Sequence, residues 1–117
     1  CLAPWLPGAR RDNTRALVRA LERYPVDIVT HPGWRLDIDT RELARACAAT
    51  GTLLEINTSH RETTVDFIRV ARREGVRFVI NSDAHTPERV GDLGWGIALA
   101  RDAGLEAAEV ANIEEVL

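Results

Sequence analysis

Apolar and polar positions in this chain follow two alternating periodicities, one typical of buried strands and the other of amphipathic helices. Three buried strands are predicted from short apolar runs, at residues 26–30, 52–57 and 76–80. Four helices are predicted from apolar positions three and four residues apart, at about residues 14–24, 40–50, 63–74 and 90–103. Two further elements are expected near the end, a short strand at 110–112 and the start of a helix at 113–117.

Polar and glycine residues at the ends of these segments agree with the helix assignments. Asn13 or Thr14 is expected to cap the first helix. Asp39 and Glu42 have the spacing of a capping box, in which side-chain and backbone groups at a helix start bond reciprocally. Gly51 is expected to end that second helix, because glycine readily adopts the left-handed conformation that follows a helix.

Strands that alternate with helices indicate a parallel sheet with right-handed crossovers, which places the chain in the α/β class. His31, Asn57 and Asp83 are spaced 26 residues apart, and each lies at or just after the end of a predicted strand. The carboxyl ends of parallel strands lie at one edge of a sheet, where α/β enzymes place their chemistry. Part of a barrel and an open three-layer sheet both fit this pattern, although three or four strands cannot close a barrel alone.

The most distinctive polar motif is Asn81-Ser82-Asp83-Ala84-His85, which follows the apolar residues 78–80. On an extended chain, the side chains of Asp83 and His85 point to the same side. A carboxylate and an imidazole so placed can bind one cation or two adjacent ones, and they suit zinc, manganese or iron. The alternative is a turn in which Asp83 caps the segment that follows.

Two more candidate residues belong to the preceding strands. His31 leaves a buried strand into a Pro-Gly turn, and with Asp83 and His85 it would complete three ligands, the usual number at a catalytic zinc. A structural histidine is the alternative. Glu55 lies in a strongly apolar strand, and a buried carboxylate needs a partner. It is interpreted chiefly as a carboxylate that does not touch the metal but orients a histidine ligand. Metal ligation and a salt bridge to an arginine are the other roles considered.

The loop after the second strand adds further polar side chains. Asn57 shares a strand face with Glu55, because alternate residues of a strand point to the same side. His60 can bind metal or substrate, although an exposed loop histidine is the simpler interpretation. Arg61 can bind a phosphate oxygen. The chain contains neither a Walker-type phosphate loop nor a nucleophile elbow.

Composition narrows the choice of partners and compartment. The net charge of -3 gives no indication of a general affinity for nucleic acid or acidic membranes. Arg69, Arg72 and Arg73 are expected to form a solvated helix face. The two cysteines make no disulfide framework, and reduced cysteines, with Cys47 at a buried helix position, fit a cytoplasmic protein. No signal peptide or membrane-spanning apolar stretch is found, and the absence of methionine predicts that the chain is a piece of a longer protein or lacks its own beginning.

Three of these motifs occur in the order and at the spacing of one known family. His31-Pro32-Gly33, Leu54-Glu55-Ile56-Asn57 and the Asp83 motif resemble the PHP (polymerase and histidinol phosphatase) superfamily. The resemblance covers about residues 10–117 and identifies residues 1–117 as the C-terminal half of a single PHP domain. It implies part of a distorted β/α barrel with seven parallel strands, whose carboxyl ends bind up to three divalent metal ions (zinc, manganese or iron).

The resemblance also implies roles for the candidate residues. His31, Asp83 and His85 match family metal ligands and are the expected catalytic residues, whereas Glu55 and Asn57 match a motif near the site. The pair His60-Arg61 resembles a loop in the PHP domains of bacterial family X polymerases. The His-x-His motif with which the family opens is absent from this chain, so residues 1–117 alone are expected to be inactive.

The function implied for the intact domain is metal-dependent hydrolysis of a phosphate monoester on a phosphorylated small molecule. A second possibility is the PHP module of a DNA polymerase, which would act on nucleic acid as a 3′-5′ exonuclease. The sequence also allows a non-catalytic PHP scaffold or a metal-dependent amidohydrolase. Half a barrel exposes an apolar edge that favours pairing, so the oligomeric state is left open.

Overall fold

The fold is that of a computed structural model, which describes residues 10–32, 37–61 and 63–112. Within these residues, one sheet contains the strands β1 (Ile28–Val29), β2 (Leu53–Asn57) and β3 (Phe78–Asn81). The α-helices are α1 (Arg10–Arg23), α2 (Thr40–Thr50), α3 (Val65–Arg72) and α4 (Gly94–Asp102). Two 3-10 helices flank α4, η1 (Pro87–Arg89) and η2 (Ala107–Glu109).

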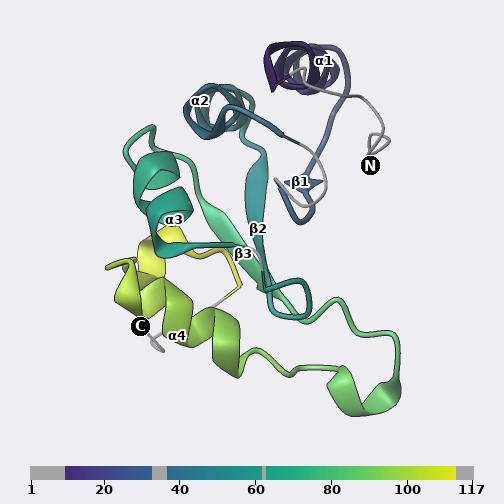
Figure 1. Cartoon of the computed structure of the whole chain (residues 1–117), viewed down its shortest axis with the longest axis vertical. Coiled ribbons are helices and arrows are strands. Elements are labelled where there is room, and N and C mark those ends of the chain that lie inside the picture. The colour runs from purple at the N-terminus through teal and green to yellow at the C-terminus, as the bar shows by residue number, and fades with distance from the viewer. Residues whose placement is uncertain (1–9, 33–36, 62, 113–117) are drawn as a thin grey trace.

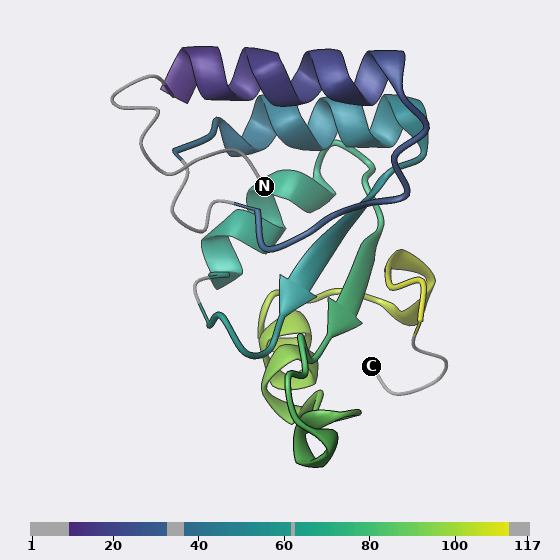
Figure 2. The same cartoon turned by 90° about the vertical axis from the view of Figure 1, so that its right-hand side faces the viewer.

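The sheet is parallel with the strand order β1-β2-β3, so the predicted α/β topology is confirmed. Its register aligns Asn57 at the end of β2 with Asn81 at the end of β3. The arrowheads of β2 and β3 accordingly lie at the same edge of the sheet (Figure 2). A barrel that includes this sheet stays a prediction, because three parallel strands occur in both architectures that the sequence allows.

The helices α2, α3 and α4 follow one another along the sheet, and α1 packs on α2 (Figure 1). Between helices and sheet lies one core, to which the strands contribute side chains in alternation. Leu54 and Ile56 of β2 are fully buried in it, together with Phe78 and Ile80 of β3. Glu55 and Asn57 alternate with these residues and therefore point to the other side of the sheet.

The helix α4 packs tightly against the sheet at Gly96. A Cβ atom added there would lie 2.6 Å from Thr58 Cγ2 and 2.7 Å from Ile80 Cγ2, closer than side chains tolerate. We expect Gly96→Ala to lower the free energy of unfolding by about 1–3 kcal/mol, the usual effect of overpacking. Urea denaturation measures this change, and Gly94→Ala in the same helix is the matched control. No described atom lies within 4 Å of a Cβ at Gly94, so a Gly96→Ala protein as stable as this control would contradict the prediction.

The start of α1 differs from the prediction that Asn13 or Thr14 caps it. The helix already includes Arg10, and both predicted caps are buried inside it. Asn13 Nδ2 donates to the Asp37 carbonyl at 3.1 Å, and Thr14 Oγ1 accepts from the Asp39 amide at 2.8 Å. The prediction was wrong because these polar groups join α1 to the segment before α2 instead of satisfying amides of their own helix.

The Asp39 cap of α2 and the glycine after the helix are confirmed, but the reciprocal half of the predicted capping box is wrong, because the Asp39 amide donates to Thr14 Oγ1 instead of Glu42. Asp39 accepts a hydrogen bond from the Glu42 amide, and Gly51 has the left-handed φ of 72°.

The helix α4 begins later than the predicted residue 90, since Gly91 has a φ of 80° that no α-helix contains. The strand expected at 110–112 is reduced to one parallel bridge between Val110 and Phe78. The helix start expected at 113–117 lies outside the described residues.

Cys47 is buried in α2, as its apolar position predicts, and burial raises the pKa of its thiol to about 12. This thiol is therefore protonated and unreactive at neutral pH.

In the described part of the chain, no helix combines the length and the apolar character needed to cross a membrane.

Candidate functional site

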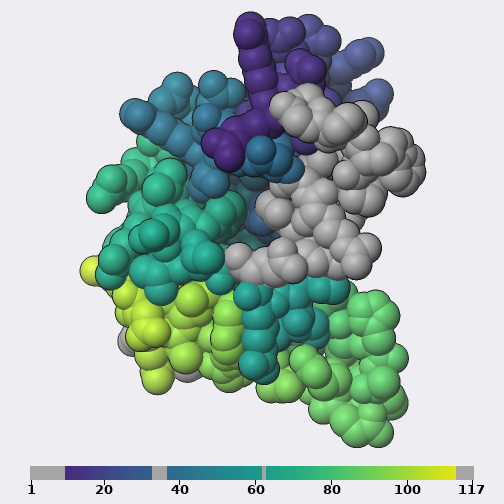
Figure 3. Space-filling model, in the orientation of Figure 1, coloured from purple at the N-terminus to yellow at the C-terminus, as the bar shows by residue number. Residues whose placement is uncertain are grey.

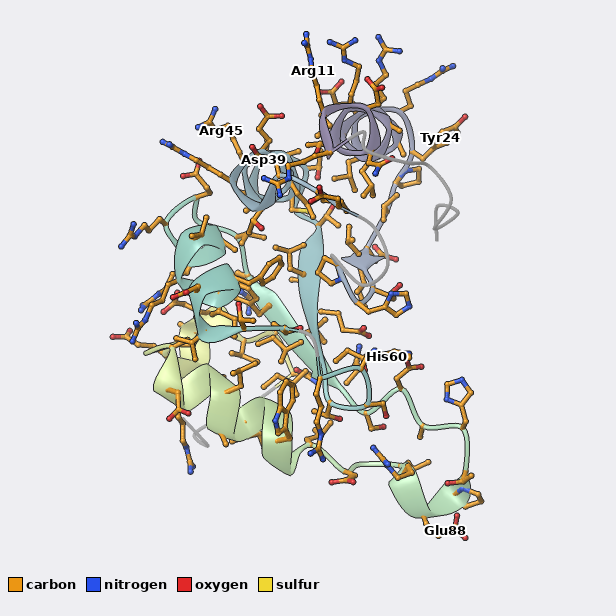
Figure 4. All side chains as sticks on the ribbon, in the orientation of Figure 1. Arg11, Tyr24, Asp39, Arg45, His60 and Glu88 are labelled. Atoms are coloured by element: carbon orange, nitrogen blue, oxygen red, sulfur yellow. The ribbon has the colours of Figure 1, made fainter. Side chains whose placement is uncertain are left out.

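Polar side chains from all three strands meet at the carboxyl edge of the sheet. His31 lies just after β1, Asn57 ends β2, and Asp83 lies just after β3. His60 extends from the loop after β2 toward the same edge (Figure 4). The equal sequence spacing of the first three residues thus corresponds to a common position in space.

Glu55 connects the three strand ends through its buried carboxylate, which is only 4% exposed. Its Oε1 accepts hydrogen bonds from the His31 backbone amide at 2.8 Å and from Asn57 Nδ2 at 2.9 Å. Its Oε2 accepts a bond from Asn81 Nδ2 at 3.0 Å. The predicted link between Glu55 and a histidine therefore runs through the backbone of His31, and amides rather than an arginine satisfy the carboxylate.

Asn57 is fully buried, and its side chain uses both its donor and its acceptor groups. Nδ2 donates to Glu55 and also to Asp83 Oδ2, the latter at 3.0 Å. Oδ1 accepts from the backbone amides of Ser59 at 2.9 Å and His60 at 2.8 Å. One amide group thus holds two carboxylates and the loop that carries His60 in a single arrangement.

Asp83 is the carboxylate at the centre of the exposed part of the site. The hydrogen bond from Asn57 lowers the pKa of its carboxyl group below the ordinary value, and the nearby imidazoles of His60, His85 and His31 act in the same direction. Partial desolvation opposes this shift. Asp83 is consequently ionised at neutral pH and available to a cation or a proton donor.

His60 is closer to the centre of the site than the sequence indicates. Its Nε2 lies 3.1 Å from Asp83 Oδ2. Its ring also meets that of His31 edge to face, with 5.4 Å between the ring centroids. The simpler interpretation of His60 as an exposed loop histidine was wrong, because the bonds from Asn57 turn its loop toward the strand ends.

The backbone is unusual at two of these residues. His31 has a φ of 27° and Asp83 a φ of 50°, and both are residues other than glycine in the left-handed region. Such conformations cost on the order of 1–3 kcal/mol each and cluster at functional sites. The side chains of Glu55 and Asn57 hold the two positions, since one binds the His31 amide and the other the Asp83 carboxylate.

His85 stands apart from this group. Its side chain is 80% exposed, and its Nδ1 lies 2.8 Å from the Asp83 carbonyl oxygen and 4.0 Å from Asp83 Oδ1. Across residues 10–32, 37–61 and 63–112, no group of three or more His, Cys, Asp or Glu side chains is close enough to hold a metal ion. The contacts described above bring His31, His60 and Asp83 together, whereas the ligand role of His85 stays a prediction.

Two arginines border the site beside the His60 loop. Arg61 places its guanidinium 5.6 Å from the ring centroid of Trp95, within the range of a cation–π contact. Arg89 donates from Nη2 to Ser59 Oγ at 3.1 Å. Both side chains reach the rim of the strand ends, where a guanidinium can bind phosphate oxygens.

Sequence reasoning assigned no role to four of these residues: Asn81, Ser59, Arg89 and Trp95. A signal existed for Asn81, which lies two residues before Asp83 at the end of a strand and faces the same way as Glu55 on its neighbour. The contacts of Arg89 and Trp95 join segments about 30 residues apart, as in the 30-residue separation of Arg89 from Ser59, and no local pattern predicts them.

Comparison with known proteins relates the chain to phosphatases and to a DNA polymerase. It is 31% identical over 91% of its length to a probable phosphatase of Syntrophotalea carbinolica and covers 48% of that protein. It is 30% identical over 91% of its length to a probable phosphatase of Shewanella sediminis and covers 47% of it. A DNA polymerase/3'-5' exonuclease PolX of Bacillus subtilis is 33% identical over 84% of the chain, which covers 19% of that protein.

The class that these relatives define is a phosphatase-like hydrolase. The chain spans about half the length of the phosphatases and about a fifth of the polymerase that it matches. No protein-family model matches it. The names of the relatives agree with the two leading functions that the family resemblance implies, a phosphatase and a polymerase-linked exonuclease.

Proposed function

We propose that residues 1–117 form the C-terminal half of a PHP-type domain, and that the whole protein is a metal-dependent phosphoesterase. One observation carries the proposal: the ends of three parallel strands bring His31, His60 and Asp83 together over a buried network of Glu55 and Asn57. The similarity to proteins named as phosphatases supports it.

The chemistry of the donor set fits a divalent transition metal. An ionised carboxylate surrounded by imidazoles offers the oxygen and nitrogen ligands that zinc, manganese and iron accept. In this proposal Asp83, His31 and His85 each contribute a ligand to bound metal ions, with His60 as a further candidate. Because no three of the described side chains are close enough to hold one ion, the rest of the whole protein supplies the additional ligands. Bound cations supply Lewis-acid activation of water and neutralise charge on the phosphate oxygens.

The remaining residues of the site position these groups and the substrate. Glu55 holds the backbone of His31, and Asn57 holds the carboxylate of Asp83, so both ligands are oriented before substrate arrives. Arg61, kept at the rim by Trp95, is suited to bind a non-bridging phosphate oxygen. The substrate we propose is a phosphate monoester of a small molecule.

The proposal is tested by phosphate release from an aryl phosphate with the full-length protein. We expect chelation to remove the activity and added manganese or zinc to restore it. Residues 1–117 alone should show no turnover, because they provide too few ligands for the several charges that phosphate hydrolysis requires. Activity that is unaffected by the chelator would contradict metal dependence.

A second candidate function is 3′-5′ exonuclease activity, which the similarity to the PolX protein favours. Release of nucleotides from an end-labelled oligonucleotide measures it under the same metal conditions. A higher kcat/KM for the oligonucleotide than for the aryl phosphate would favour the exonuclease. A full-length protein that binds no metal and acts on neither substrate would instead be a scaffold.

A further inference from the structure

A cleft on the outer face of the helices gathers three arginines that take no part in the strand-end site. Its volume is about 380 Å³, and it lies between α3 and the segment that follows α4. Three arginines, Arg69, Arg72 and Arg73, line it with Ala103 and Glu109. Figure 3 shows that α3 and the residues after α4 form one continuous surface. These arginines thus surround a concavity, rather than only the solvated helix face expected from the sequence.

The charges in this cleft do not cancel. Arg72 binds Glu109 through two bonds, from Nε at 3.1 Å and from Nη2 at 2.7 Å, so this pair is internally neutral. Arg69 reaches only a backbone carbonyl, that of Asp102, at 3.3 Å. Arg73 has no ionic partner among the described residues. Two guanidinium charges therefore remain without a carboxylate partner in the lining, in a chain whose net charge is -3.

The lining also limits the kind of ligand that the cleft can bind. Arg72 is held in place by Glu109, and its Nη1 faces Gly104, where a Cβ would lie 3.2 Å away. The two bonds to Glu109 use Nε and Nη2 of Arg72, so Nη1 can donate to another acceptor. Ala103 is the one apolar residue of the lining, so the cleft has no aromatic surface on which a nucleobase would stack. Its volume falls within the range of small-molecule sites.

We propose that this cleft binds a compact polyanion of the pyrophosphate type, with Arg69 and Arg73 as its principal cationic contacts. Guanidinium groups bind phosphoryl oxygens through paired, charge-assisted hydrogen bonds. The site is separate from the strand ends. The helix α3 leads from the carboxyl end of β2 to the start of β3, so Arg72 and Arg73 at its end lie toward the opposite edge of the sheet. The inference is independent of the proposed hydrolase activity.

Calorimetric titration of the chelated full-length protein with sodium pyrophosphate tests the proposal, at an ionic strength held constant with chloride. We expect saturable binding that the double variant Arg69→Gln/Arg73→Gln weakens by roughly tenfold or more, as loss of charge-assisted hydrogen bonds implies. Arg11→Gln is the control, because Arg11 is exposed on α1 and extends away from α3 and α4 (Figure 4). This control should bind as the unaltered protein does.

Two further variants separate this site from the strand ends. Binding that persists in Asp83→Asn and in Arg61→Gln supports the cleft, whatever the outcome of the phosphatase assay. Binding that Arg61→Gln removes and the double variant leaves intact would place the anion at the strand ends and overturn the inference. Equal weakening by Arg11→Gln would also overturn it, since it would indicate a general charge effect. Unchanged thermal unfolding of each variant shows that the fold is retained.

Discussion

Replacement of Asp83 by asparagine in the full-length protein is expected to abolish phosphate release while the fold is retained. The hydrogen bond from Asn57 keeps the pKa of the Asp83 carboxyl below its ordinary value, so the group is anionic at neutral pH. Asparagine has the same shape and can still accept the bond from Asn57 Nδ2, but it carries no charge for a cation. Loss of a residue that only orients a metal ligand typically lowers activity or metal affinity ten- to a hundredfold. Loss of the anionic ligand itself should therefore lower activity by more than roughly a hundredfold.

Turnover of an aryl phosphate with manganese or zinc measures the effect of Asp83→Asn. Asp12→Asn is the matched control, because it makes the same chemical change on the exposed surface of α1. Thermal unfolding of both variants should stay close to that of the unaltered protein. Full activity of Asp83→Asn would exclude this carboxylate from the reaction and would remove the main support for the proposed function.

Replacement of Asn57 by alanine should have the largest effect on stability and should also reduce activity. The variant loses all four hydrogen bonds of the side chain and leaves Glu55 and Asp83 without their shared donor. Because these acceptors are carboxylates and the position is buried, we expect a decrease of about 2–4 kcal/mol in the free energy of unfolding. Activity should fall roughly ten- to a hundredfold through misplacement of Asp83.

A double-mutant cycle distinguishes this positioning role from general destabilisation. Asn57→Ala and Asp83→Asn should be non-additive in the free energy of unfolding, since the two side chains are in contact. Asn57→Ala and Asp12→Asn should be additive, because α1 lies far from the strand ends (Figure 1). Asn81→Ala removes a bond to Glu55 alone, so it should lower the free energy of unfolding and the activity less than Asn57→Ala does. Additive effects of Asn57→Ala and Asp83→Asn would refute the direct link.

The sequence alone was sufficient to predict the order of helices and strands, the parallel sheet and the common edge of His31, Asn57 and Asp83. Apolar periodicity is a property of neighbouring residues, and the equal 26-residue spacing of the three strand ends is visible in the sequence itself. The Asp39 cap was predictable for the same reason, because the carboxylate and the amide it binds are three residues apart. A buried carboxylate at Glu55 also required partners, whatever their identity.

The tertiary structure alone decided which groups those partners are. Glu55 binds the amide of His31, 24 residues away, and this contact depends on strand register together with the left-handed backbone of His31. The inward position of His60 depends on the bonds that Asn57 makes to its loop, whereas the outward position of His85 follows the left-handed turn at Asp83. Such contacts join residues distant in the chain, so their geometry is set by packing and register and leaves no local pattern from which to predict it.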